Sequence, residues 1–220
     1  MENKTETQNP EYKTLLLLED VKQEIISNIK SINREGVDKL LAWLLKSDYF
    51  TAPSSKDKHS AFEGGLALHS HLVYGLLKDK CEYWKIRKPD LIIPDDDSLK
   101  IIAYCHDLCK CNFYTKVTKP VKNGTKVNGY GKTVANWIDK EVYDIDDKFP
   151  LSHSYKSIII LQNFIKLTTT EILGIAHHMS IMGSANYGDI QAFNKALEMN
   201  KFILLVHTAD FESSVLLEEK

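Results

Sequence analysis

The sequence has little of what marks a membrane protein, a secreted protein or a protein that coats long nucleic acids. No apolar run approaches the roughly 20 residues that a membrane span needs. The first ten residues, M-E-N-K-T-E-T-Q-N-P, lack the apolar core of a signal peptide. Of the 28 basic residues only Arg34 and Arg87 are arginine, and the net charge is −2, so neither bidentate phosphate binding nor a broad basic surface is indicated. We expect a cytoplasmic protein that crosses no membrane.

Cysteine is also sparse, and its arrangement argues against a zinc ribbon or knuckle. Cys105, Cys109 and Cys111 lie close together, and the fourth cysteine, Cys81, is isolated. A second cysteine pair, which a structural zinc site of this kind requires, is lacking. We therefore expect reduced thiols that pack inside helices.

What is present in abundance is apolar residues at helical spacing. Of the 220 residues 43% are hydrophobic, enough for a globular core. The spacing predicts two N-terminal helices within residues 1–47, at about 12–32 and 37–45, that pack on a larger, mostly helical domain at 48–220. Within that domain it predicts a helix from Leu66, and a second helix with Asp97 or Ser98 as its N-cap. Two more helices are predicted between Ser152 and His178, and the second of them begins with a capping threonine that Glu171 follows by about three residues. The last predicted helix is continuous from Ile190 through Asp210.

The segment at about 113–147 differs from the rest. It alternates polar and apolar residues, and its Asn123-Gly124 dipeptide is a strong signal for a hairpin turn. We expect a small β-hairpin inserted into an otherwise all-α fold. Its lysines either form the cationic edge of a cleft or lie on solvated strand faces; they are Lys116, Lys119, Lys122 and Lys126.

The His106-Asp107 pair follows an apolar run, I-I-A-Y-C, at the end of a predicted helix. Buried polar groups of this kind cost free energy unless they are bound. Each histidine alone can be explained as a helix residue, and the His177-His178 pair can simply offset a helix dipole. However, seven of the eight histidines fall in predicted helices or at their ends, and imidazole with carboxylate is a ligand set for divalent transition metals. The sequence therefore favours a metal site.

Spacing narrows the candidate ligands in two places. His69 and His71 are two residues apart, about 200° around a helix, so they do not share a face and only one of them is a candidate ligand. His207 and Asp210 are three residues apart and do share a face.

Three stretches, G-G-L-A-L-H-S-H-L-V, A-Y-C-H-D-L-C-K and L-V-H-T-A-D, resemble the HD-domain superfamily of metal-dependent phosphohydrolases. The resemblance covers about residues 48–213 and implies a helical bundle that holds a metal. Carried over by position, it makes ligands of His69, His106, Asp107 and Asp210, with Asp107 suited to bridge two ions. Members with two metals add histidines where His153 and His178 stand here, with His177 as the alternative to His178.

The resemblance also implies a chemistry. One or two divalent ions, of Mn²⁺, Fe²⁺, Mg²⁺, Ni²⁺ or Co²⁺, activate water, and Asp107 and Lys110 serve the reaction. Lys110 either meets a substrate phosphate or positions the nucleophile, unless it is a solvent-facing lysine at a helix end. The expected substrate is a phosphomonoester or phosphodiester of a nucleotide, or the end of a short single-stranded nucleic acid. Roles for His59, His71 and His207 stay open.

Two other functions fit the same residues: an HD-type di-iron oxygenase and a nucleotide-binding regulatory protein without turnover. We expect neither the G-Y-P extension of the branch that cleaves cyclic dinucleotides nor an N-terminal OB-fold. Selectivity would then lie in three segments, at 50–63, at 113–147 and around Ser184 to Asp189. A dimer through the N-terminal helices is possible. Three loop tyrosines are available to stack on a base: Tyr114, Tyr130 and Tyr187.

Overall fold

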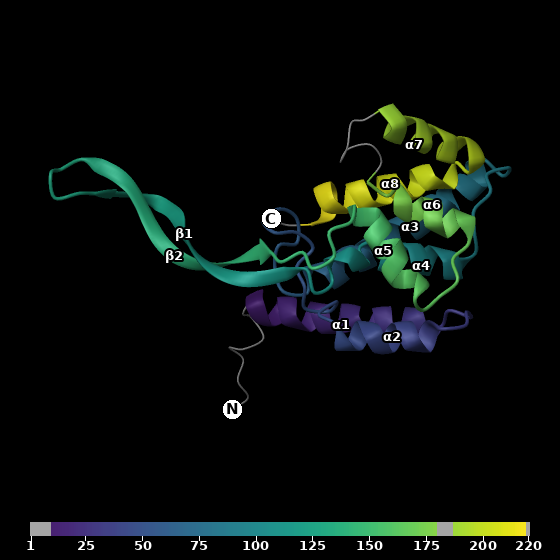
Figure 1. The fold of residues 1–220 in the computed structure, drawn as a ribbon, viewed down its shortest axis with the longest axis horizontal. Helices are drawn as coiled ribbons and strands as arrows, with labels where there is room; N and C mark the ends of the chain where they lie inside the picture. The colour runs from purple at the N-terminus through teal and green to yellow at the C-terminus, as the bar shows by residue number, and fades with distance from the viewer. Residues whose placement is uncertain (1–9, 180–186, 219–220) are drawn as a thin grey trace.

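The computed structural model describes residues 10–179 and 187–218, and most of these residues are helical (Figure 1). A 3₁₀ helix at Leu108–Lys110 and a π-helix at Ser213–Leu217 adjoin the site described below. The α-helices are α1 (Pro10–Lys30), α2 (Val37–Lys46), α3 (Gly65–Arg87), α4 (Asp96–Cys105), α5 (His153–Gln162), α6 (Thr169–Ala176), α7 (Tyr187–Met199) and α8 (Phe202–Glu212).

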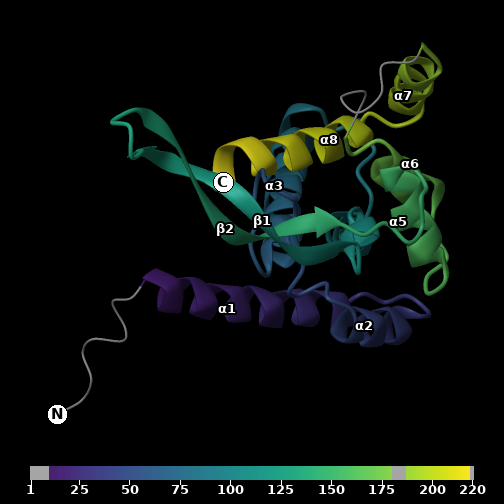
Figure 2. The ribbon, with the colours of Figure 1, turned by 60° about the vertical axis from the view of Figure 1, so that its left-hand side comes forward.

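Helix α3 is the centre of the helical body. It contacts α1, α4 and α8, while α1 and α2 lie along one side of the body (Figure 2). Leu66 and Leu77 of α3 and Ile101 and Ile102 of α4 are fully buried. Burial of such side chains is the main stabilising contribution to a fold of this kind. No helix in the described part of the chain has the length and apolarity needed to cross a membrane.

The two glycines before α3 have a structural reason. Gly64 has a φ of 86°, a left-handed conformation that other residues rarely adopt. A Cβ atom on Gly65 would lie 2.0 Å from the carbonyl oxygen of Ser60. The G-G pair therefore lets the loop before α3 pack directly against the start of the helix that carries His69.

The expectation of an all-α fold with a small hairpin is wrong. Strands β1 (Tyr114–Val127) and β2 (Thr133–Ile145) are 14 and 13 residues long and form an antiparallel sheet. A typical strand has about five or six residues. This sheet, which we call the arm, projects from the helical body (Figure 1). The protein is mostly helical, with a long two-stranded sheet.

The turn of the arm also lies later than the sequence indicated. Asn123-Gly124 falls inside β1, where the pairing register shifts between Lys122 and Thr125 and Gly124 has a φ of 69°. The chain turns instead at residues 128–132, where Oδ1 of Asn128 accepts hydrogen bonds from two backbone amides, both at 3.0 Å. An Asn-Gly pair suits a left-handed bulge as well as a turn, so residue type alone did not separate them.

Two helix boundaries differ from expectation and one is confirmed. The continuous helix predicted from Ile190 is two helices, α7 and α8, with a break at Asn200, whose side chain accepts a hydrogen bond from the amide of Phe202 at 3.0 Å. Helix α4 is capped by Asp95, which accepts from the amide of Ser98 at 2.9 Å, and not by Asp97 or Ser98. The capping box at the start of α6 is confirmed: Thr168 and Glu171 bond reciprocally. Residues 184–186 of the loop at Ser184 to Asp189 lie outside the described residues.

Candidate metal centre

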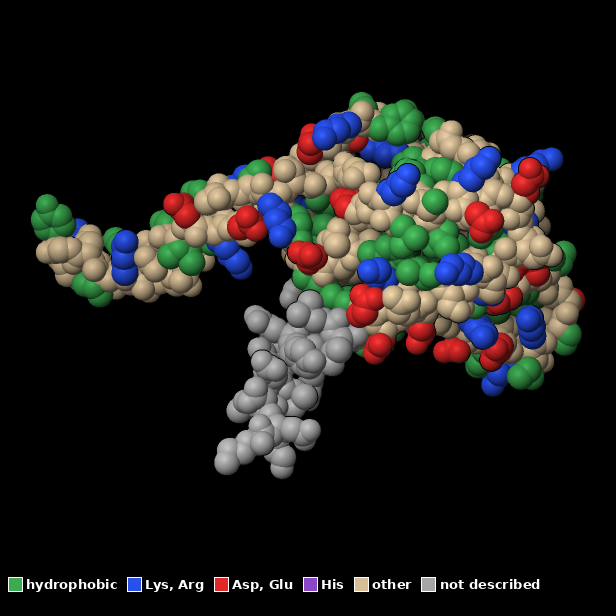
Figure 3. Space-filling model, turned by 90° about the horizontal axis from the view of Figure 1, so that it is seen from below, with side chains coloured by type: hydrophobic (Ala, Val, Ile, Leu, Met, Phe, Trp, Pro, Cys, Tyr) green, Lys and Arg blue, Asp and Glu red, His purple; other side chains and the backbone are tan. Residues whose placement is uncertain are grey.

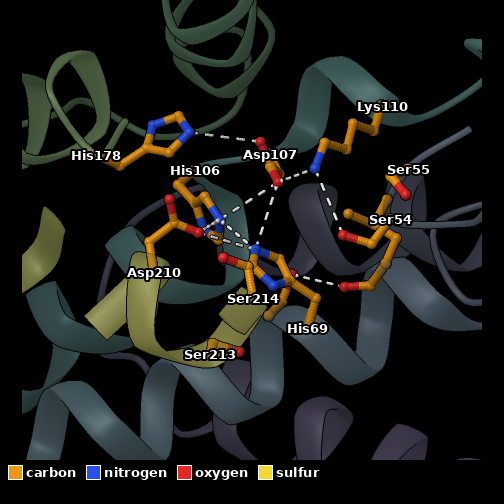
Figure 4. A network of polar contacts seen from close by, with 12 residues as sticks. Ser54, Ser55, His69, His106, Asp107, Lys110, His178, Asp210, Ser213 and Ser214 are labelled. Carbon is orange, nitrogen blue, oxygen red and sulfur yellow. Dashed lines mark hydrogen bonds and ion pairs between the residues drawn. The ribbon is translucent and has the colours of Figure 1, made fainter. Parts of the chain in front are cut away.

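Side chains from five helical segments converge at one point in the body, and Figure 4 shows those of His69, His106, Asp107, His178 and Asp210. His69 comes from α3, the His106-Asp107 pair from the end of α4, His153 from the start of α5, His178 from the end of α6 and Asp210 from α8. His69, His106, Asp107 and His178 are buried. Residues separated by up to 141 positions in the sequence thus meet in one cluster. All six residues that the sequence nominated as metal ligands belong to it.

The two oxygens of Asp107 face different sets of histidines. Its Oδ2 atom lies 3.6 Å from Nε2 of His69 and 3.4 Å from Nε2 of His106. Its Oδ1 atom lies 2.6 Å from Nε2 of His153 and 3.6 Å from Nε2 of His178. A carboxylate between two groups of imidazoles can serve one cation with each oxygen.

Asp210 completes the first of these groups. Its Oδ1 atom lies 3.1 Å from Nε2 of His69 and 3.7 Å from Nε2 of His106. The two imidazole nitrogens are themselves 3.1 Å apart. Two carboxylates and two imidazoles are therefore grouped around the Nε2 atoms of His69 and His106.

Three of the imidazole rings are held by a hydrogen bond at the opposite nitrogen. Nδ1 of His106 donates to the carbonyl of Ala103 at 2.8 Å, and Nδ1 of His178 donates to the carbonyl of Ile175 at 2.7 Å. Nδ1 of His69 donates to Oε1 of Glu218 at 2.6 Å. Each bond fixes the ring and leaves Nε2 directed at the cluster, which is how proteins orient metal-binding histidines.

Burial and neighbouring charges shift the pKa values of the side chains in the cluster. Burial alone would lower the pKa of His69, but the carboxylates of Asp210 and Glu218 outweigh burial and raise that pKa to about 9. Burial would raise the pKa of Asp107, yet Lys110 and His106 hold it well below its usual range. The pKa of His178 is lowered to about 3 by burial and by the neighbouring His106. The ionised carboxylates thus favour positive charge at His69, whereas His178 stays neutral.

One atom in the cluster lacks a hydrogen bond. Oδ1 of Asp107 is buried and accepts none, although Nε2 of His153 lies 2.6 Å away. A buried carboxylate oxygen needs a facing cation, and Asp107 raises the pKa of His153 to about 10 against the effect of burial, so either a protonated His153 or a metal ion can fill that place. The donor set also fits a divalent transition ion, because it combines imidazole nitrogens with carboxylate oxygens. The buried His, Asp and Cys groups here lie close enough together to hold a metal ion.

Lys110 and a cavity adjoin the cluster. The Nζ atom of Lys110 lies 2.6 Å from Oδ2 of Asp107 and 3.5 Å from Oγ of Ser54, and its side chain is only 12% exposed. It does not extend into solvent. A cavity of about 750 Å³ opens onto the cluster, a volume suited to a small-molecule ligand. Its walls include Lys58, His59, Lys110, His207, Phe211 and Glu218.

The structure separates the paired histidines. His178 lies in the cluster, whereas the ring of His177 lies 5.7 Å from that of Phe193. His71 points away from His69 and lies 3.3 Å from the carboxylate of Glu24. His207 donates from Nδ1 to the backbone carbonyl of His178 at 2.7 Å, so it supports the segment that carries His178.

Two residues near the cluster, Cys109 and Glu218, escaped the sequence analysis as candidate ligands, and the role of a third, His59, had been left open. His59 and Glu218 each lie close enough to His69 to share an ion with it. Cys109 was expected only to pack, but its Sγ atom lies 3.0 Å from Nδ1 of His153. The proximity of Cys109 to Asp107 in the sequence was a usable signal. Glu218 gave none, because its position depends on the π-helix that follows α8.

Scans against protein-family models, curated proteins and solved structures found no match to this chain.

Proposed function

We propose that this protein is a divalent-metal-dependent phosphohydrolase of the HD type. Its substrate would be a phosphomonoester or phosphodiester of a nucleotide or of a short single-stranded nucleic acid. The observation that supports this most directly is the position of Asp107 between two sets of imidazoles. His69 and His106, with Asp210, lie near one of its oxygens, and His153 and His178 lie near the other. That arrangement uses the residues, and the order, that the resemblance to HD phosphohydrolases implies.

The residues of the two groups have separate tasks. His69, His106 and Asp210 would hold one ion, and His153 and His178 a second, with Asp107 contributing one oxygen to each. A divalent ion held there lowers the pKa of bound water and polarises a phosphoryl oxygen. Hydrolysis then forms a bond from a water oxygen to phosphorus and breaks the ester P–O bond, and the leaving oxygen takes up a proton. This chemistry needs no serine or cysteine nucleophile.

Lys110 is placed to meet the substrate. Its ammonium group lies against Asp107 on the wall of the cavity, where a non-bridging phosphate oxygen would approach. Lys58 lines the same cavity, so two cationic side chains are available to an anionic ligand. A lysine acts as a point charge and tolerates several phosphate orientations. The cavity therefore suits an anion such as a phosphate ester.

The test combines metal content with turnover. Purified wild-type protein and Asp107→Ala are analysed for metals, and phosphate release from a panel of nucleotides is measured with added Mn²⁺. We expect about two ions per chain in the wild type, and loss of both metal and activity in the variant. Wild-type protein that holds no metal and releases no phosphate after reconstitution would exclude the hydrolase.

His177→Ala provides the matched control. This variant removes the imidazole of the residue next to His178, and that imidazole lies outside the cluster. We expect this variant to keep its metal and its activity. Because Asp107→Ala leaves Lys110 without its buried partner, Asp107→Asn is measured in parallel, and thermal unfolding of each variant shows whether the fold is intact.

A further inference from the structure

The outer arm, residues 119–138, carries positive charge that is only partly compensated. It contains four lysines, Lys119, Lys122, Lys126 and Lys132, and no aspartate or glutamate, although the whole chain has a net charge of −2. Lys119 pairs with Asp144 at 2.6 Å. The side chains of the other three lysines form no ion pair with any residue that the structure describes. The outer arm is therefore a cationic surface on an acidic protein.

Aromatic side chains accompany these lysines. Tyr130, in the turn, is 92% exposed and Trp137 is 58% exposed. Trp137 is the direct partner of Lys122 in the strand register, so the two side chains share a face of the sheet. Figure 3 shows blue and green side chains at the outer end of the arm and red ones nearer the body. Exposed aromatic rings beside unpaired lysines are typical of surfaces that bind single-stranded nucleic acid.

The arm has no packing of its own to explain these side chains. No residue of either strand is buried, and an isolated two-stranded sheet is marginally stable in water. A bound partner would therefore stabilise the arm as well as use it. The positive charge indicates which partner fits. Phosphate groups would neutralise the three unpaired lysines, whereas an apolar protein surface would bury these lysines without opposite charges.

The arm also begins only a few residues after a side chain that lines the metal cavity. Tyr114, its first residue, follows Lys110 by only four positions in the sequence. Lys110 itself lines the cavity. A strand that lies along the arm would thus run toward the cluster, where a terminal phosphate ester could enter.

We propose that the outer arm binds single-stranded nucleic acid, with the lysines contacting phosphates and Trp137 and Tyr130 stacking on bases. The end of the strand then enters the metal cavity, a step that rests on the proposed phosphohydrolase function. A duplex binds more weakly, because its bases are stacked on one another and are not available to the aromatic rings.

The experiment measures binding separately from hydrolysis. Fluorescence anisotropy is recorded with labelled oligothymidylate and oligouridylate in EDTA, over a series of salt concentrations, and with a duplex of equal length. Replacing Lys122, Lys126 and Lys132 by alanine should lower the slope of log affinity against log salt by about 2, since each phosphate contact on a single strand contributes roughly 0.7. Trp137→Ala should weaken binding by roughly 5- to 150-fold.

Matched variants on the helical body test whether the arm itself is responsible. A triple variant of the exposed residues Lys39, Lys46 and Lys85 removes the same charge, and Trp84→Ala removes an exposed tryptophan from α3. We expect both to bind as the wild type does. Equal losses in arm and body variants, or no salt-dependent binding by the wild type, would overturn the proposal. A dimer that the arm variants convert to a monomer, in the absence of strand binding, would assign the arm to self-association instead.

The two proposals fail in different ways. Strand binding through the arm without phosphate or nucleotide release in Mn²⁺ would keep the arm proposal and exclude the hydrolase. Release of phosphate from mononucleotides without any strand binding would keep the hydrolase and exclude the arm as a nucleic-acid site.

Discussion

Polar side chains serve opposite purposes in the helical body and in the arm. In the body, His69, His106, Asp107 and His178 are buried, and hydrogen bonds to backbone carbonyls and to Glu218 fix the three imidazole rings. In the arm, lysines and aromatic rings are exposed and no residue is buried. A preorganised centre requires a rigid surrounding core, whereas a surface that follows a flexible strand does not. The comparison indicates that the stability of this protein resides in the body.

The strongest test of that comparison removes apolar volume from each region. Ile102→Ala, in the fully buried part of α4, should lower the free energy of unfolding by about 2–5 kcal/mol, because a cavity remains. Val121→Ala, in the partly exposed β1 strand, should lower it by about 0.5 kcal/mol or less. Urea unfolding measures both. Equal losses would mean that the arm contributes to the core.

A smaller change in free energy, here of metal binding, is expected when the carboxylate that holds His69 is replaced. Glu218→Gln keeps the size of the side chain but removes the charge that faces Nδ1 of His69 at 2.6 Å. Loss of such a supporting group should weaken metal affinity by about 10- to 100-fold. Titration of the metal-free protein with Mn²⁺ or Fe²⁺, followed by calorimetry, measures it.

The control for Glu218→Gln is Glu212→Gln, which removes a nearby carboxylate that pairs with Lys80 at 2.6 Å and does not face His69. Its metal affinity should match that of the wild type. If both variants lose affinity equally, the effect belongs to the net charge of the region and not to the bond with His69.

The smallest effect is expected from excising the outer arm. The outer arm and the two residues after it, Asp139 and Lys140, are replaced by an Asn-Gly turn that joins the paired residues Thr118 and Glu141. Metal content should be unchanged, and the free energy of unfolding should change by about 0.5 kcal/mol or less. Loss of metal on excision would show that the arm helps to form the centre, contrary to the comparison drawn above.

The spacing of apolar residues predicted the helices, whereas the resemblance to HD phosphohydrolases nominated the clustered side chains. Helical spacing of apolar residues placed His69 on the face of α3 opposite to His71, as the structure shows. The choice between His177 and His178 could not be made in this way, because both lie where α6 ends and backbone direction decides which ring turns inward.

Other features depended on long-range packing. The contact of Glu218 with His69 follows from the path of the π-helix, which no local pattern indicated. The length of the arm was underestimated because Asn123-Gly124 has the composition of a turn but lies in a bulge, and the residues beyond it continue the strand.

The hydrogen bond between His69 and Glu218 also bears on how the centre is made during synthesis. The two residues are 149 positions apart, and a ribosome that adds about 5–20 residues per second needs on the order of 10–30 seconds to cover that distance. Helix α3 therefore emerges well before the carboxylate that orients its histidine. A metal that arrives early meets an unfinished set of ligands, and the centre can close only once α8 and the segment after it have folded back over α3.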